Sequence, residues 1–233
     1  MIRNVKALGL ALIAVFAMSA MVASAAQAEN GVLDLRPGAA GTKVKINGAQ
    51  VNKHVFTVTE SNVECNVAEF QGIGEYETNA TTLSVHPVYT GCTAFGFLNA
   101  NVNTENCNYE GMANGAGEST EEGKMLTWNT GEIKVVCSGT NTININAAGV
   151  CEASVGSQTI ANGLKFTNTT VEGKMDFDII ANKAPVKTKK NLDGFGCPFK
   201  EKGETTGEYT GPTTIRCFEG NTPVDCTIKT KGT

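Results

Sequence analysis

Histidine, tryptophan and aromatic residues in general are scarce in this chain. Histidine occurs twice in 233 residues, at His54 and His86, tryptophan occurs once, and aromatic residues make up 6% of the sequence. A serine or cysteine nucleophile needs a base within hydrogen-bond reach, most often histidine, and the sequence has no Gly-x-Ser-x-Gly segment. Both histidines lie in alternating stretches, where we expect surface or half-buried strand positions. The sequence therefore argues against an enzyme, and we assign no catalytic residue.

Paired carboxylates and metal-binding spacings are also lacking. Asp176 and Asp178 share one face of a predicted strand, whereas the two carboxylates of a glycosidase flank the bond they cleave. The turn at residues 191–194 resembles part of a calcium loop, but Lys189 and Lys200 occupy its first and last ligand positions. No two cysteines lie closer than nine residues, which disfavours a zinc ribbon. We expect no metal and no other cofactor.

Positive charge is in short supply as well. Lysine and arginine number 19 against 23 aspartate and glutamate residues, which gives a net charge of −4 at neutral pH. Nucleic-acid affinity comes mostly from basic side chains that neutralise phosphates, so we expect no nucleic-acid partner. No apolar run long enough to cross a bilayer follows residue 28. We therefore expect no transmembrane span in the mature chain.

The first 28 residues have the three-part layout of a secretory signal. Arg3 and Lys6 precede an apolar run over residues 7–22, and the small residues of Ala26-Gln27-Ala28 follow. A cut after Ala28 is the first choice, a cut after Ala25 the second, and retention as an uncleaved anchor is the alternative. We divide the chain into a signal peptide, residues 1–28, and an exported domain, residues 29–233.

Eight cysteines lie in the exported part, and an even set in an oxidising compartment indicates disulfides. Between Cys217 and Cys226 lie Gly220, Asn221 and Pro223, which suit a turn that brings the two sulfurs together. We therefore pair Cys217 with Cys226, and Cys65 with Cys92 as the next choice. The pairing among the other four stays open: Cys107, Cys137, Cys151 and Cys197.

Apolar and polar residues alternate at period two along most of the exported part. The alternation is plain at residues 54–59, 83–89, 142–146 and 175–179, and glycine-rich turns separate these stretches. No stretch after the signal has helical periodicity. The sequence predicts an all-β fold, an antiparallel sandwich or barrel stapled by disulfides. Residues 110–124 are polar and glycine-rich, and we expect a loop there that allows a sub-boundary within the domain.

The order of several cysteine-containing segments resembles that of uncharacterised secreted β-proteins of actinobacteria. The segments are Cys65 in a strand, Tyr-Thr-Gly-Cys-Thr at 89–93, Asn-Cys-Asn-Tyr at 106–109, Val-Val-Cys at 135–137, Gly-Val-Cys at 149–151 and Cys197. The resemblance covers most of residues 50–210 and leaves Cys217 and Cys226 outside. It implies a secreted β fold and no particular activity.

One stretch concentrates positive charge, because Lys183, Lys187, Lys189 and Lys190 surround Pro185 without an acidic residue between them. We expect an exposed basic loop at 182–191, either a plain solvated loop or a contact with an anionic envelope polymer or lipid surface.

Three functions are open for the exported domain. The first is a non-enzymatic structural or binding component at or outside the cell envelope. The second is a glycan- or envelope-polymer-binding module, for which Asn144 and Asn146 on a strand face, and Tyr76, Tyr109 and Tyr209 near glycine turns, are candidate contacts. The third is a secreted hydrolase. Trp128 shares one face of an alternating stretch with Leu126 and is expected in the core.

We predict that the exported protein begins at Glu29, because the small residues before it fit the signal-peptidase pocket. N-terminal sequencing of the exported fraction tests this. Recovery of exported protein that still carries Met1 would overturn soluble secretion.

Overall fold

The computed structural model of the protein describes residues 31–36, 41–114, 118–119, 126–168, 174–190, 197 and 202–230. Every regular element in this part of the chain is a β-strand, and all pairings between strands are antiparallel. The predicted all-β, antiparallel, disulfide-containing fold is confirmed. The predicted signal peptide lies outside the described residues.

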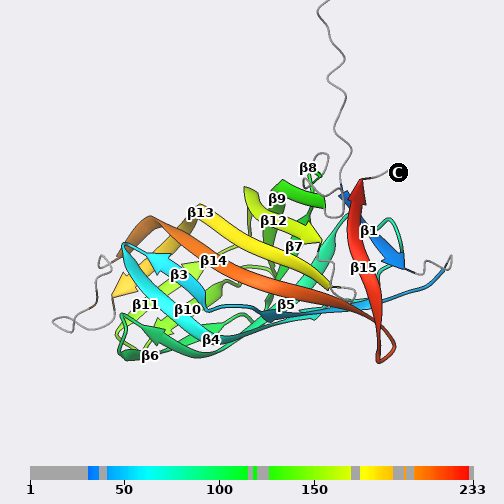
Figure 1. Ribbon diagram of the computed structural model, residues 1–233. Coiled ribbons are helices and arrows are strands. Elements are labelled where there is room, and N and C mark those ends of the chain that lie inside the picture. The colour runs from blue at the N-terminus through cyan, green and yellow to red at the C-terminus, as the bar shows by residue number, and fades with distance from the viewer. Residues whose placement is uncertain are drawn as a thin grey trace, which may run out of the picture.

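Fifteen strands join into one sheet (Figure 1). In chain order they are β1 (Gly31–Arg36), β2 (Lys45–Gln50), β3 (His54–Val58), β4 (Ser61–Gly72), β5 (Leu83–Ala94), β6 (Leu98–Asn103), β7 (Cys107–Met112), β8 (Glu118–Ser119), β9 (Leu126–Cys137), β10 (Ile143–Ala147), β11 (Cys151–Val155), β12 (Gln158–Asn168), β13 (Lys174–Lys190), β14 (Lys202–Glu219) and β15 (Thr222–Thr230).

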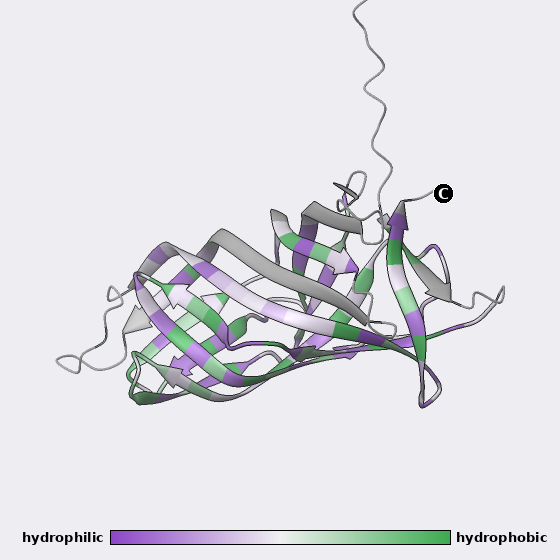
Figure 2. Ribbon diagram, in the orientation of Figure 1, coloured by the Kyte–Doolittle hydropathy of each residue, from purple (hydrophilic) through white to green (hydrophobic). Residues whose placement is uncertain are grey.

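Hydrophobic and hydrophilic residues alternate along the strands (Figure 2). Buried and solvent-facing side chains alternate with them. In β3, His54, Phe56 and Val58 are buried, and the two residues between them are half-buried. In β5, Leu83, Val85, Pro87 and Tyr89 share the buried face, as the sequence predicts. Because successive side chains of a strand point to opposite faces, one face of the sheet forms a single apolar core.

The strand pairings close into two circuits that share β4, β5, β13 and β14. One circuit runs from β14 through β2, β4, β5, β7, β9, β12 and β13 back to β14. The other runs from β14 through β3, β4, β5, β6, β10, β11 and β13 back to β14. In Figure 1, β13 and β14 pass along one side of the molecule and β4 along the other.

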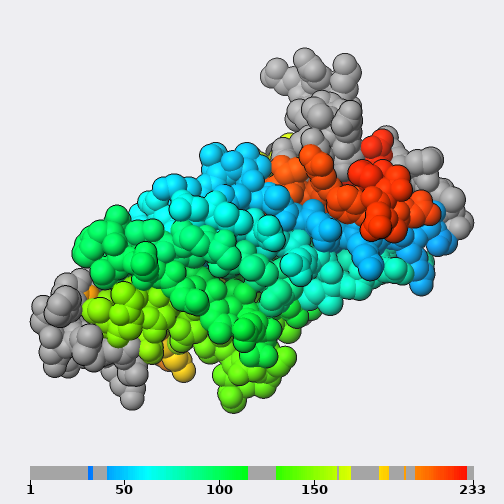
Figure 3. Space-filling view, turned by 90° about the horizontal axis from the view of Figure 1, so that it is seen from below, coloured from blue at the N-terminus to red at the C-terminus, as the bar shows by residue number. Residues whose placement is uncertain are grey.

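Between β5 and β13 the sheet is divided into two branches, β7–β9–β12 and β6–β10–β11. β1 and β15 extend the sheet beyond β14 at one end of an elongated molecule (Figures 1 and 3). The core therefore lies between the shared strands on one side and the two branches on the other.

Four disulfides fasten this sheet, and the described residues include no free cysteine. Cys65 is bonded to Cys92 and Cys217 to Cys226, the two pairs that the sequence predicts. The pairs left open are Cys107–Cys137 and Cys151–Cys197. Cys65 and Cys92 face each other directly in the β4–β5 register, and Cys107 and Cys137 in the β7–β9 register. Two of the disulfides therefore link neighbouring strands at opposed positions.

The expected basic loop at 182–191 is wrong, because residues 182–190 belong to β13. They pair with β14 on one edge and, from Lys187 onward, with β11 on the other. Ala184, Val186 and Thr188 are buried while Pro185 and Lys187 are exposed. The inward residues are small or polar, so the stretch lacks the strong apolar alternation of a typical strand.

The polar stretch at 110–124 is only partly a loop. Its first residues belong to β7, and Glu118–Ser119 form β8, which pairs with β9. β7 before the stretch pairs with β9 after it, so both sides of the stretch belong to one sheet. Residues 115–117 and 120–124 lie outside the described part of the chain.

The described residues contain no helix that is long and apolar enough to span a membrane. The four disulfides fit an oxidising environment such as the extracellular space.

Removing the Cys65–Cys92 bond should destabilise the protein more than removing Cys217–Cys226. The first closes a loop of 27 residues and the second a loop of nine. A disulfide that closes a longer loop removes more conformational entropy from the unfolded chain. C65A/C92A should lower the free energy of unfolding by about 3 to 4 kcal/mol, and C217A/C226A by about 2 to 3 kcal/mol. Urea unfolding of the two double variants beside the parent measures both values. Equal losses, or the reverse order, would contradict the loop-entropy account.

Candidate functional site

The two histidines occupy different environments and do not come together. His86 is half-buried in β5, where its Nδ1 lies 3.2 Å from Oδ1 of Asn108. His54 is fully buried, which corrects the expectation of a surface or half-buried position. The inward face of β3 places His54 in the core, beside aromatic side chains contributed by other strands.

Three tyrosines meet His54 in the core. Tyr89 comes from β5, Tyr109 from β7 and Tyr209 from β14, and all three are buried. Nδ1 of His54 lies 2.5 Å from the Tyr209 hydroxyl, and the Tyr209 and Tyr89 hydroxyls are 2.7 Å apart. The Tyr89 hydroxyl donates to the Tyr109 oxygen at 3.2 Å. We call these four residues the tyrosine–histidine cluster.

Each hydroxyl has one proton, so the tautomer of His54 and the directions of the tyrosine hydrogen bonds depend on one another. With the proton on Nδ1, His54 donates to Tyr209, and Nε2 can accept from the Thr213 hydroxyl at 3.4 Å. With the proton on Nε2, His54 donates to the Pro212 carbonyl at 3.2 Å and accepts from Tyr209.

All four residues of the cluster are uncharged at neutral pH. Burial lowers the pKa of His54 to about 4, and the contact with the Pro212 carbonyl opposes this shift only in part. Burial raises the pKa of Tyr109 to about 12 and holds those of Tyr89 and Tyr209 well above their ordinary value. The cluster therefore offers neutral hydrogen-bonding groups and no buried charge.

Glycines on the inner face of β14 make room for these rings. Gly207, Tyr209, Gly211 and Thr213 follow one another on the buried side of the strand. A Cβ on Gly211 would collide with the His54 ring, and one on Gly207 would lie 2.7 Å from a methyl group of Val186. This alternation of glycine with larger residues is a sequence signal for the cluster. Neither the spacing of the histidines nor a catalytic motif indicates it.

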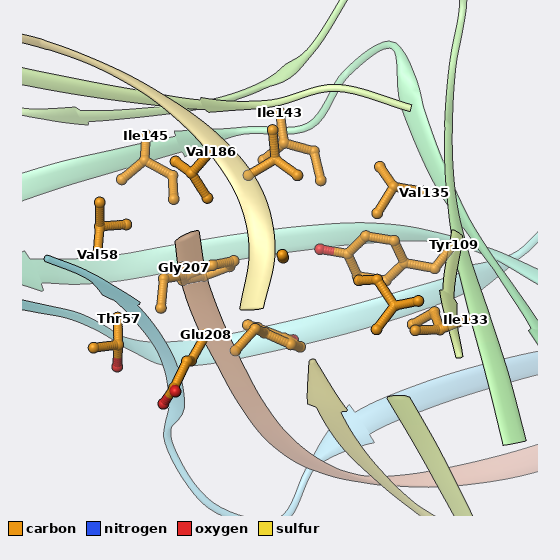
Figure 4. Close-up of a pocket in the computed structure, with 15 residues that line it drawn as sticks. Thr57, Val58, Tyr109, Ile133, Val135, Ile143, Ile145, Val186, Gly207 and Glu208 are labelled. Atoms are coloured by element: carbon orange, nitrogen blue, oxygen red, sulfur yellow. The ribbon is translucent and has the colours of Figure 1, made fainter. Parts of the chain in front are cut away.

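An apolar cavity of about 50 Å³ lies beside the cluster, and we call it the interior cavity. Carbon atoms make up nearly all of its lining, to which both branches of the sheet contribute: Ile133 and Val135 from β9, Ile143 and Ile145 from β10. Thr57 and Glu208 also border the cavity. Figure 4 shows the Tyr109 hydroxyl pointing into it from one end.

Lys187 is the one residue of the lysine group whose side chain the structure describes, and it lies near an acidic residue. Lys187 is exposed, and its Nζ lies 3.8 Å from Oε1 of Glu204 on the neighbouring strand. Glu152 of β11 is the register partner of Lys189. The side chains of Lys183, Lys189 and Lys190 lie outside the described residues. Lys187 therefore lies beside an acidic side chain, and the expectation for the other three lysines stays a prediction.

The candidate glycan contacts are mostly engaged in the fold. Asn146 accepts a hydrogen bond from the backbone N–H of Gly149 at 2.7 Å and donates to Glu152, so it closes the β10–β11 turn. The Tyr76 hydroxyl donates to backbone carbonyls and accepts from Ser84 N–H. Tyr109 and Tyr209 are buried. Asn144 remains on the outer face, in a polar groove of about 370 Å³.

Other residues singled out in the sequence give no further site. The side chains of Asp176, Asp178 and Trp128 and the turn at 191–194 lie outside the described residues. Within the described part of the chain, no group of three or more histidine, cysteine, aspartate or glutamate residues could hold a metal ion.

The chain matches no protein-family model, no curated protein and no solved structure. The resemblance to secreted actinobacterial β-proteins therefore stays a prediction, and the site is argued from its geometry alone.

The buried histidine should make stability depend on pH. An unfolded histidine titrates near 6.5 and His54 near 4, so the unfolded chain binds more protons between these values. Stability should fall by up to about 3 kcal/mol as the pH drops from 6.5 to 4. H54Q should lose this part of the pH dependence, whereas H86Q, which leaves the cluster intact, should keep it. Urea unfolding at several pH values measures the slopes, and equal slopes in parent and H54Q would refute the assignment.

Proposed function

We propose that the protein is an exported, non-enzymatic binding component that works at or outside the cell envelope and takes a small apolar molecule into its interior cavity. The interior cavity itself carries this proposal. Protein cores are normally packed to the density of organic crystals, and empty apolar space costs stability. A cavity kept open at the centre of a disulfide-fastened sheet therefore favours an occupant.

The closed strand circuits support such a container. Of the two alternatives that the sequence leaves open, a barrel suits them better than a sandwich, because both circuits return to β14 through hydrogen-bonded neighbours. Small barrels are known to hold one small ligand in their interior.

The chemistry of the interior supports binding rather than catalysis. The cluster is neutral, its donors and acceptors are directed at one another, and all eight cysteines are in disulfides. A hydrolase would need an activated nucleophile or a metal-bound water. A binding role needs only the apolar cavity and a few orienting polar groups.

Export is supported by two independent features. The signal-like layout of residues 1–28 addresses the chain to the secretory route. The pairing of all eight cysteines fits an oxidising compartment, because cytosolic thiols are generally kept reduced.

Glycan binding is the second candidate, and one observation favours it. The polar groove around Asn144 also contains Glu152, Ser154, Lys187 and Glu204, side chains that can hydrogen-bond to hydroxyl groups. It lacks an aromatic platform, so we rank it below the interior cavity. Attachment of the lysine group to an anionic polymer ranks lower still, because acidic residues lie beside it.

Xenon, a compact apolar probe, should raise the melting temperature of the parent protein, because apolar cavities take up xenon and a ligand that binds only the folded state stabilises it. A184L should abolish this shift, since Ala184 lines the cavity and the larger side chain would fill it. A49L adds the same atoms to the exposed face of β2 and should respond as the parent does. The absence of a shift in the parent, or an undiminished shift in A184L, would reject the binding function.

A further inference from the structure

A polar groove of about 430 Å³ lies on the outer face of the sheet, over the paired strands β2 and β14. We call it the outer groove. Asn47 and Ala49 of β2 line it, together with Thr214, Arg216 and Phe218 of β14. These five residues alternate with buried residues along their strands, so their side chains point away from the core. The outer groove is therefore separate from the interior cavity.

Arg216 is the only charged residue in the described lining of the outer groove. It is exposed, and within the described part of the chain it has no ion pair and no side-chain hydrogen bond. The exposed Glu219 and Asp225 of the β14–β15 hairpin do not pair with it. Lys187 in the groove around Asn144, by contrast, has a carboxylate of Glu204 at 3.8 Å. The outer groove thus keeps a positive charge that no side chain neutralises.

The strand register places a second basic residue beside Arg216. The register partner of Arg216 on β13 is Lys174, and its partner on β2 is the uncharged Asn47. Acidic residues come in the next row of the sheet, where Glu69 and Asp176 lie at the two ends. The row that contains Arg216 is therefore basic.

We propose that the outer groove binds a small organic oxyanion, a carboxylate or a phosphate monoester, whose apolar part packs against Phe218. The guanidinium of Arg216 presents its N–H groups as a planar fork that matches two oxygens of one oxyanion. The amide of Asn47 beside it can donate a further hydrogen bond. This site does not depend on the interior cavity and goes beyond the function proposed above.

The charge of the whole protein favours a small anion over a polyanion. The net charge is −4, so a polymer with many negative charges would be repelled by the rest of the surface. A single oxyanion interacts mainly with the charges nearest to it, because charges beyond about 8 Å are screened at physiological ionic strength. A cation would meet the unpaired guanidinium of Arg216 and no carboxylate in the described lining.

The size of the outer groove sets the choice of probes. Its volume of about 430 Å³ lies within the range of about 300 to 1,000 Å³ that is usual for small-molecule sites. A single ring with one charged substituent fits such a space. Benzoate and phenyl phosphate offer a carboxylate or a phosphate on the same ring, and benzamide is a neutral molecule of nearly the same shape as benzoate.

The experiment titrates the parent, R216Q and K187Q with these three probes and follows the backbone amide signals by NMR. In the parent, benzoate or phenyl phosphate should bind about tenfold more tightly than benzamide, since hydrogen bonds to charged groups are the stronger ones, and should shift the signals of Asn47 and Thr214. R216Q should lose this preference for the anion. K187Q removes the same charge from the groove around Asn144 and should keep the preference.

A further variant tests the location without changing a charge. A49L adds a larger side chain to the lining of the outer groove and should weaken binding of the anion, while its response to xenon should remain that of the parent.

Several results would overturn the assignment. It is wrong if neither anion binds the parent more tightly than benzamide does, or if R216Q retains the preference. Equal losses in R216Q and K187Q would also reject it, because they would show an effect of net charge alone. Undiminished binding to A49L would place the anion elsewhere. None of these results bears on the interior cavity, which the xenon measurement tests.

Discussion

Closure of the hydrogen-bonded sheet is the constraint on which the rest of the structure depends. The shared strands β4, β5, β13 and β14 find partners on both edges, so the backbone polar groups are satisfied within the sheet. The inward side chains then face backbone whose polar groups are mostly paired within the sheet. Any polar side chain placed inside must find its partner among other side chains or at the few irregular positions of the strands.

The tyrosine–histidine cluster is the response to that constraint. Each member is contributed by a different strand, β3, β5, β7 or β14, and each contact supplies the hydrogen bond that its neighbour lacks. Because partly satisfied polar networks are costly in a low-dielectric core, the contacts depend on one another. Gly211 shows how tightly the backbone is fitted to this arrangement, since no side chain could replace its hydrogen without displacing His54. Burial also keeps His54 neutral, so the network holds no charge that would need a counter-ion.

Local sequence patterns predicted the individual strands and the disulfide that spans a single turn. Alternation identified the strands at 54–59, 83–89 and 142–146, and turn residues identified the Cys217–Cys226 pair across nine residues. β13 was read partly as a loop because its buried residues Ala184 and Thr188 are small or polar, and Pro185 and Lys187 lie exposed between them. The pairs Cys107–Cys137 and Cys151–Cys197 depend on which strands become neighbours, which alternation cannot give.

The candidate site could not be predicted for the same reason. His54 and Tyr209 are 155 residues apart in sequence, and no spacing rule connects residues that meet only because a sheet closes. The sequence around His54 resembles that around His86, because both lie in alternating stretches. Alternation shows that residues share a face of a strand but not which face is buried. The inner-face glycines of β14 were visible in the sequence, but their meaning required knowing that β3 is a neighbour.

The division of the sheet explains why space remains beside the cluster. Ile133 and Val135 of β9 and Ile143 and Ile145 of β10 line the same cavity, although β9 and β10 belong to different branches and do not pair. The interior cavity therefore lies where inward side chains of two branches meet without a hydrogen-bonded strand pair between them.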